Sequence, residues 1–234
     1  MTIWAILPAA GIGRRLGSVT PKQYLPLNGI PVIQHALNLL AQFNAIARIT
    51  VVISEEDEHW PQVSMADYAG DRVVTVTGGT ERSSSVLNGL HSLDAKKDDW
   101  VLVHDAVRPC VTALDVQRLL AGITTAPDLA GGILASPMSN TVKRVSEAGL
   151  VEATVDRSAL WNALTPQIFK YGLLLNAMEA AERSGQTVTD EASAMEYAGH
   201  AVKVIPASNH NIKITHASDL TLAELILRAQ DEGL

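Results

Sequence analysis

The stretch Leu7-Pro8-Ala9-Ala10-Gly11-Ile12-Gly13-Arg14-Arg15-Leu16-Gly17 decides the fold, because in it an apolar strand runs into a glycine-rich loop with two adjacent arginines. Glycine permits positive φ and close backbone approach to a ligand, and arginine offers a charged fork of donors suited to phosphate oxygens. Lys22, directly after Pro21, adds a compact cation. The loop is a candidate phosphate-binding element, although small residues here also serve tight packing in many α/β folds.

Short apolar runs alternate with helical patterns along the rest of the chain. Strands are expected at residues 3–7, 49–53, 73–76, 100–103 and 132–134, and helices at residues 32–40, 84–93, 114–123, 173–181 and 220–229. Buried parallel strands with amphipathic helices between them predict an α/β fold with a doubly wound sheet. Ligands collect at the carboxyl ends of the strands in this architecture, so the segments after the strands are the candidate sites.

Composition sets bounds on the class of protein. The 234 residues are 47% hydrophobic, which is enough for one sizeable core, and we expect a single domain over residues 1–234. The net charge of −7 and the scattered cations provide no basic face for a nucleic-acid backbone. A small anionic metabolite stays open as the partner, because local cations matter more than the total charge.

No membrane span and no export signal are expected, because the first apolar run stops at Gly11 and no uninterrupted apolar stretch reaches about 18 residues. The single Cys110 excludes an intramolecular disulfide and fits a reducing compartment. We therefore expect a cytoplasmic protein.

A second polar cluster, Gly78-Gly79-Thr80-Glu81-Arg82-Ser83-Ser84-Ser85-Val86, follows the third expected strand and opens a helix. In a purely structural interpretation, Ser83, Ser84 or Ser85 caps that helix. In the functional interpretation, the paired glycines let the backbone lie against a flat base, and a serine hydroxyl and the helix N-terminus supply donors.

After the fourth expected strand comes His104-Asp105-Ala106-Val107-Arg108-Pro109. Asp105 and Arg108 form either a simple ion pair or a pair that faces the substrate. One carboxylate does not make a protein-built metal cage, but Mg²⁺ that arrives with substrate phosphates needs only one or two protein oxygens. Asp105 is therefore the candidate magnesium ligand, directly, through water, or not at all.

Residues 137–156 have a different pattern of residue types, in which apolar residues lie among polar ones and Gly149 stands near the middle. This pattern predicts a β-hairpin arm, and because a two-stranded hairpin is barely stable alone, we expect it to pack on a second copy of the chain. Further on, Thr189-Asp190-Glu191-Ala192-Ser193 is typical of a capped helix start. The segment 211–215 is expected to be an apolar strand whose Lys213 faces either solvent or an anion.

Six motifs together carry a resemblance that covers essentially the whole chain. They are Pro8-Ala9-Ala10-Gly11-Ile12-Gly13-Arg14-Arg15, Pro21-Lys22-Gln23-Tyr24, Gly78-Gly79-Thr80-Glu81-Arg82, the segment 104–109, the segment 189–193 and Asn211-Ile212-Lys213. In this order they resemble the 2-C-methyl-D-erythritol 4-phosphate cytidylyltransferase family. The resemblance implies a Rossmann-like nucleotidyltransferase fold and a homodimer with interlocked arms. It also implies transfer of CMP from CTP to methylerythritol phosphate, releasing pyrophosphate, in non-mevalonate isoprenoid biosynthesis.

The resemblance also implies residue roles. Arg15, Lys22 and Lys213 are the expected catalytic cations, and Mg²⁺ is expected mostly on the CTP phosphates. Contacts to CTP are expected from Pro8, Ala9, Ala10, Gly11, Gly13, Arg14, Gly78, Gly79, Ser85, Asp105 and Ala106. The methylerythritol phosphate pocket is expected from Arg108, Thr141, Arg157, Thr165 and Thr189. Thr141 and Arg157 flank the arm, so we expect each pocket to receive them from the other subunit.

Three alternatives stay open. Ribitol 5-phosphate cytidylyltransferase shares the fold, CTP and most of the cations, but the first loop and the segment 189–193 are more similar to the methylerythritol enzyme. A nicotinamide-dependent oxidoreductase needs a glycine triplet at dinucleotide spacing and does not need Arg14, Arg15 and Lys22. A non-catalytic nucleotide-binding module is the third. Ser84 and His210 stand where the family often has acids, which affects local hydrogen bonding more than function.

Overall fold

The structure is a computed structural model that describes residues 2–11, 20–63, 70–124 and 129–233. Its centre is a seven-stranded sheet in the order β11-β7-β10-β6-β1-β4-β5. The strands are β1 (Ile3–Pro8), β4 (Ile46–Ile53), β5 (Val73–Thr77), β6 (Trp100–Val103), β7 (Gly131–Pro137), β10 (Trp161–Lys170) and β11 (Lys203–Pro206). β10 runs antiparallel to both β6 and β7, and the other neighbouring strands pair in parallel. The sheet is thus mostly parallel, as expected.

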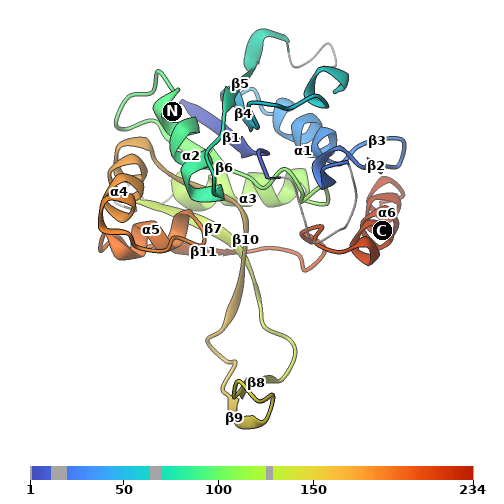
Figure 1. Ribbon diagram of the computed structural model, residues 1–234, viewed down its shortest axis with the longest axis vertical. Helices are drawn as coiled ribbons and strands as arrows, with labels where there is room; N and C mark the ends of the chain where they lie inside the picture. Colours follow the sequence, from blue (N-terminus) through green and yellow to red (C-terminus); the bar gives the residue numbers. More distant parts are fainter. Residues whose placement is uncertain (1, 12–19, 64–69, 125–128, 234) are drawn as a thin grey trace.

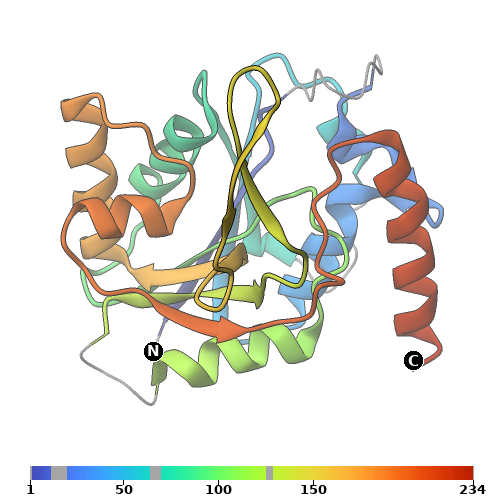
Figure 2. The same cartoon turned by 90° about the horizontal axis from the view of Figure 1, so that it is seen from below.

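Helices cover both faces of this sheet (Figures 1 and 2). They are α1 (Val32–Ala41), α2 (Arg82–His91), α3 (Ala113–Thr124), α4 (Tyr171–Ser184), α5 (Glu191–Tyr197) and α6 (Ala217–Asp231). Successive side chains of a strand point to opposite faces. Accordingly, Ala5 and Leu7 of β1 pack in the core with α1 and α3, whereas Ile6 packs in the core with α2, α4 and α5. The alternation within one strand builds the two layers.

Smaller elements complete the described chain. They are the strand pair β2 (Pro26–Leu27) and β3 (Ile30–Pro31) and short 3-10 helices at Lys22–Tyr24, Trp60–Gln62 and Gly70–Arg72. α6 packs through Ala223 and Ile226 on a separate apolar cluster with Leu27 and Cys110. In the described part of the chain, no helix has the length and apolar character needed to cross a membrane.

The expected strands and helices are present, with ends moved by a few residues, except for the strand expected at residues 211–215. Two strands of the sheet, β10 and β11, were not predicted. In β10, the polar residues Thr165 and Gln167 interrupt the apolar run. The strand expected at residues 211–215 is wrong. That segment is irregular and does not join the sheet, and Ile214 N donates to Val107 O.

The predicted hairpin is present as β8 (Val142–Val145) and β9 (Val151–Val155), which pair antiparallel. Gly149 turns the chain between them with φ +78°. The arm projects well away from the sheet (Figure 1). Its base continues past residue 156, since Met138 N donates to Leu160 O. Leu150 and Val151 at its tip are 70% and 63% exposed, which is more than their apolar character favours in an isolated chain.

Candidate functional site

Two adjoining cavities lie at the carboxyl ends of β1 and β6. The larger, of about 390 Å³, is lined by residues 8–11, 22–23, 79–82, 85, 105–107, 213 and 215. The smaller, of about 180 Å³, is lined by Ala163, Leu164, Thr165, Gln167, Thr189 and Asp190 together with Arg108. Arg82, Asp105 and Lys213 line both cavities, so two ligands bound side by side would meet at these three residues.

Two hydrogen bonds hold Ala9, the first residue after β1, in place. Ala9 N donates to Val52 O at 2.7 Å, and the buried Gln23 side chain donates from Nε2 to Ala9 O at 2.6 Å. Gln23 sits next to Lys22, so the same bond that fixes the loop also places this cation at the rim of the cavity. Lys22 Nζ donates to Ile214 O at 3.1 Å, which ties the segment that carries Lys213 to the same rim.

Gly78 and Gly79 let the loop after β5 approach the loop after β1. A Cβ on Gly78 would lie 2.5 Å from Ala10 Cβ and 2.9 Å from Ser85 Oγ, and one on Gly79 would lie 2.5 Å from Ser84 Cβ. Glycine is therefore required at both positions by close packing. Gly79 lines the larger cavity as expected, whereas Gly78 is absent from its lining and lies against Ala10.

The start of α2 differs from the expected serine cap. The N-cap is Glu81, whose N–H donates to the N3 residue Ser84, a residue inside the first turn. Ser85 accepts from Gly79 N at 3.1 Å and donates to Glu81 O at 2.9 Å. Ser84 thus completes the capping box, and Ser85 shapes the glycine loop from within the cavity wall.

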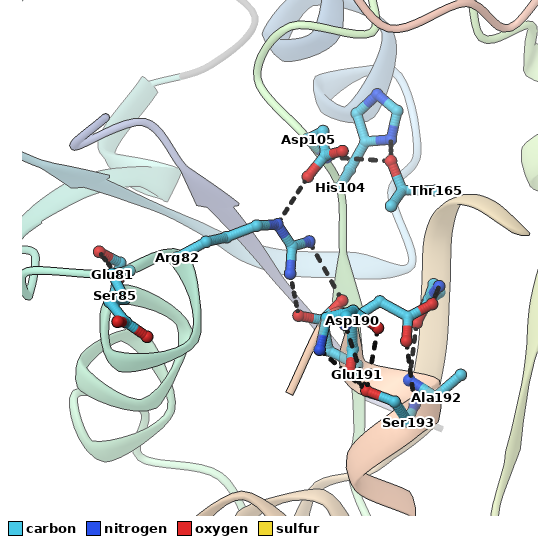
Figure 3. A network of polar contacts seen from close by, with 12 residues as sticks. Glu81, Arg82, Ser85, His104, Asp105, Thr165, Asp190, Glu191, Ala192 and Ser193 are labelled. Atoms are coloured by element: carbon cyan, nitrogen blue, oxygen red, sulfur yellow. Dashed lines mark hydrogen bonds and ion pairs between the residues drawn. The ribbon is translucent and has the colours of Figure 1, made fainter. Parts of the chain in front are cut away.

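Asp105 is the centre of the charge arrangement, and Figure 3 shows its contact with Arg82. Its Oδ1 accepts from Arg82 Nε at 2.9 Å, and its Oδ2 lies 2.9 Å from Lys213 Nζ and 3.4 Å from Arg108 Nε. Burial alone raises the pKa of this carboxyl, but the three cations outweigh burial and hold its pKa well below the usual range. Asp105 and Arg108 therefore form an ion pair, and both residues line the smaller cavity.

His104 is fully buried and organises Thr165 beside Asp105. His104 Nε2 lies 3.1 Å from Arg108 O, which can only accept, so Nε2 carries the proton. Nδ1, 2.9 Å from Thr165 Oγ1, is then the acceptor, and Thr165 in turn accepts from Asp105 N at 3.0 Å. Burial lowers the pKa of His104 to about 4, which keeps the imidazole neutral. Because the Thr165 hydroxyl donates its hydrogen bond to His104 Nδ1, Thr165 Oγ1 can only accept a hydrogen bond from a ligand.

Asn211 joins the irregular segment to the wall of the smaller cavity. Its Nδ2 donates to Thr165 O at 2.7 Å, and its carbonyl accepts from Arg108 Nη1 at 2.7 Å. These bonds place Lys213, two residues on, against Asp105. Of the two alternatives for Lys213, the side chain points at an anionic group, although that group is a carboxylate of the protein.

The start of α5 closes the smaller cavity. Asp190 is the N-cap and accepts from Ser193 N at 3.0 Å, as expected for this motif. Gln167 of β10 donates to Asp190 Oδ2 at 2.8 Å and accepts from Ala192 N at 2.9 Å. β10, which was not predicted, thus holds the segment that carries Thr189. Glu191 lies in the first turn, as expected for a capped helix start, and its side chain is completely buried against Arg82.

The structure brings most of the predicted residues together. Pro8, Ala9, Ala10, Gly11, Lys22, Gly79, Ser85, Asp105, Ala106 and Lys213 line the larger cavity, and Arg108, Thr165 and Thr189 line the smaller. Gly13, Arg14 and Arg15 lie outside the described residues. Thr141 and Arg157 lie on the arm, where Arg157 donates to Ser139 O, and they line neither cavity of this chain.

Sequence reasoning missed four residues that organise the site: Gln23, Arg82, His104 and Glu191. All four stand inside motifs that were singled out, beside residues given a role. Their side chains act on protein groups, and such contacts depend on tertiary structure that spacing in the sequence does not reveal. The signal that was available is the presence of polar residues in otherwise apolar or small-residue motifs.

A protein-built metal cage is absent from the described residues, since no three carboxylate, histidine or cysteine side chains gather there. Asp105 is the only carboxylate shared by both cavities in this part of the chain, and both of its oxygens already face cations. The donor set fits a metal carried in by phosphate oxygens rather than one resident on the protein.

A doubly wound sheet whose strand ends carry a glycine-lined cavity and several cations defines the class of α/β proteins that bind phosphorylated ligands. Residues 3–229 match the family model described as 2-C-methyl-D-erythritol 4-phosphate cytidylyltransferase. The chain belongs to this family.

Relatives and solved structures agree with this assignment. Proteins named 2-C-methyl-D-erythritol 4-phosphate cytidylyltransferase from Alteromonas mediterranea and Shewanella amazonensis are each 46% identical, over 96% and 99% of this chain and 92% and 95% of their own. A crystal structure of the Francisella tularensis protein of that name is 35% identical and superposes with a TM-score of 0.82, covering 97% of this chain and all of that one.

Proposed function

We propose that the protein transfers CMP from CTP to 2-C-methyl-D-erythritol 4-phosphate, giving 4-diphosphocytidyl-2-C-methyl-D-erythritol and pyrophosphate in isoprenoid biosynthesis. The observation that carries the proposal is the pair of adjoining cavities that share Arg82, Asp105 and Lys213. Family membership over residues 3–229 supports the choice of substrates.

In the proposed reaction, a phosphate oxygen of the acceptor attacks the α-phosphorus of CTP. The new P–O bond forms as the bond to the bridging oxygen of the β-phosphate breaks, and pyrophosphate leaves with that oxygen. The protein therefore has to align two anions that repel each other. Lys213 lies where the cavities meet and Lys22 lies at the rim of the larger one, and we assign both to the α-phosphate and the departing pyrophosphate. Arg15 is proposed for the same task.

The larger cavity is proposed to bind the nucleotide. The backbone of residues 8–11 and the paired glycines would contact the cytosine, with Ser85 as a shaped hydroxyl, and Asp105 with Ala106 would contact the ribose. Asp105 contacts three cations, so if Lys213 moves to a bound phosphate, the carboxylate still contacts Arg82 and Arg108.

The smaller cavity is proposed for the acceptor, with Arg108 and Thr189 as donors and Thr165 as an acceptor for a hydroxyl group. This division favours a polyol phosphate, which carries both an anion and hydroxyl donors. Mg²⁺ is proposed to enter on the CTP phosphates, where it would neutralise phosphate charge. A cytoplasmic location is proposed on the single, buried Cys110, whose pKa burial raises to about 12.

A homodimer is proposed because the arm, which projects from the body in Figure 1, exposes apolar residues, and because Thr141 and Arg157 line neither cavity of their own chain. In the dimer, these two residues would enter the acceptor cavity of the partner subunit. The pocket would then be complete only in the assembly.

The test is pyrophosphate release from CTP and Mg²⁺, with methylerythritol 4-phosphate or ribitol 5-phosphate as acceptor and Lys22→Ala as control. Release with methylerythritol phosphate alone, lost in the control, is expected. Release with ribitol phosphate alone would transfer the protein to the ribitol enzymes. No release with either acceptor, together with retained CTP binding, would overturn catalysis in favour of a nucleotide-binding module.

A further inference from the structure

Arg82, the first residue of α2, lies between the two cavities and contacts two carboxylates at once (Figure 3). Its Nε donates to Asp105 Oδ1 at 2.9 Å. Its Nη1 and Nη2 donate to the two oxygens of Glu191 at 2.7 and 3.2 Å. Every nitrogen of the guanidinium is therefore used in a planar fork, which fixes the orientation of the side chain more strongly than a single contact would.

Glu191 anchors this fork. Its carboxylate is completely buried in the first turn of α5, and both of its oxygens receive hydrogen bonds from Arg82. A buried carboxylate without a charged partner is strongly unfavourable, so Glu191 and Arg82 hold one another in place. The pair joins the helix that carries Ser85, in the larger cavity, to the helix whose preceding residues carry Thr189, in the smaller one.

The contact from Arg82 also determines which oxygen of Asp105 the other two cations contact. Because Arg82 occupies Oδ1, the other oxygen is left for Lys213 and Arg108. Without Arg82, both oxygens become available to these two cations. They would then be held more closely by the protein and would be less free to meet phosphate groups.

We propose that Arg82 and Glu191 form a positioning pair that orients Asp105, and through it presents Lys213 and Arg108 to the two ligands. The inference rests on the proposed function and extends it, because it assigns to two residues outside the family roles given above the task of aligning one cavity with the other. Arg82 acts through Asp105 and Glu191 acts through Arg82.

A merely structural ion pair is the competing explanation, and the variants have to separate the two. Arg82→Gln alone leaves Glu191 buried and unpaired and is expected to fold poorly. The double variant Arg82→Gln/Glu191→Gln removes both charges and keeps side chains that can hydrogen-bond, so it is the variant that tests positioning. Arg82→Lys keeps the charge balance but cannot donate to both carboxylates as a planar fork.

The matched control is Glu179→Gln/Arg183→Gln. It removes an ion pair on α4, in which Arg183 Nη1 lies 3.5 Å from Glu179 Oε2. Like the double variant at the site, it leaves the net charge unchanged. Turnover, CTP affinity and thermal unfolding are measured for the unsubstituted chain, the double variant, Arg82→Lys and the control. The kcat values are expressed per CTP-binding site, so that a loss of folded protein does not count as a loss of activity.

We expect the double variant to fold and to bind CTP within about threefold of the unsubstituted chain, while its kcat falls by about tenfold or more. Arg82→Lys is expected to lose at least about threefold in kcat, and the control to lose nothing. If both site variants keep the kcat of the unsubstituted chain per CTP-binding site, the pair is structural and the inference is overturned. If the unsubstituted chain itself has no turnover, the proposed function fails and this inference fails with it.

Discussion

A substitution at Gly78 tests whether the close approach of the loop after β5 to Ala10 matters for the nucleotide cavity. A methyl group there would meet Ala10 Cβ at 2.5 Å, so Gly78→Ala must push the loop after β5 away from the loop after β1. We expect a loss of stability of about 1–3 kcal/mol and weaker CTP binding by about tenfold. Isothermal titration with CTP and urea unfolding measure the two effects.

The control for this substitution is Gly172→Ala at the start of α4, where a Cβ meets Lys97 at 3.1 Å, away from the cavities. Its CTP affinity is expected to equal that of the unsubstituted chain. Unchanged affinity in Gly78→Ala would show that the approach of the two loops does not shape the nucleotide cavity.

His104 makes the stability of the protein depend on pH in a defined window. Its pKa is lowered by burial to about 4 in the folded protein, whereas an unfolded histidine titrates at about 6.5. Between these values the unfolded state binds more protons, so stability is full above about pH 6.5 and is lost as the pH falls towards 4. The loss due to this one residue is about 3 kcal/mol at the lower limit.

Urea unfolding at about pH 7 and about pH 4.5, compared between the unsubstituted chain and His104→Gln, measures this contribution. We expect the unsubstituted chain to lose about 2–3 kcal/mol more than the variant over this interval. The pKa of His35 is also lowered by burial, but His35 is present in both proteins and its effect cancels. An equal loss in both proteins would exclude His104 as the cause.

At the scale of single residues, the sequence predicted which positions face the cavities but not what holds them there. Gly11, Gly79, Lys22, Asp105 and Lys213 were predictable because these residue types in these motifs suit contact with a ligand. The partners of His104 and Glu191 were not, because Thr165 and Arg82 are 61 and 109 residues away along the chain. Such pairs are set by the order of strands in the sheet.

At the scale of elements, the arm is the feature whose proposed role can be separated from the rest of the fold. Leu150→Asp places a charge at the most exposed apolar position of the arm's tip. The charge stays in water in a monomer, but a dimer interface would bury it at a cost in free energy. We expect the variant to be monomeric by light scattering, to bind CTP normally and to lose at least about tenfold in kcat/KM for the acceptor.

Glu152→Gln, an exposed polar change on β9, is the control and is expected to remain dimeric and active. A monomeric Leu150→Asp with the full acceptor kcat/KM would refute the proposal that Thr141 and Arg157 act in the partner subunit. The hairpin itself was predictable from its alternating pattern and Gly149. β10 was not, because an antiparallel strand that returns from the arm has no counterpart in a simple strand-helix repeat.

At the scale of the whole molecule, the sheet order explains why the two cavities adjoin. β1 and β6 are neighbours, so the loop after β1 lies beside the segment 104–109, and β10 next to β6 brings Thr165 and Gln167 to the same edge. The irregular segment after β11 then crosses this edge and delivers Asn211 and Lys213. The order of the strands thus brings these segments to one edge, where the starts of α2 and α5 contribute further walls of the two cavities.

The most direct test of the account follows the α-phosphorus of CTP. The protein is incubated with CTP labelled at the α-phosphate, Mg²⁺ and methylerythritol 4-phosphate, and the labelled products are separated and weighed by mass spectrometry. We predict that the label appears in a diphosphate that joins cytidine to methylerythritol and that the released pyrophosphate is unlabelled. Label found in free CMP or CDP, or remaining entirely in CTP, would contradict the account.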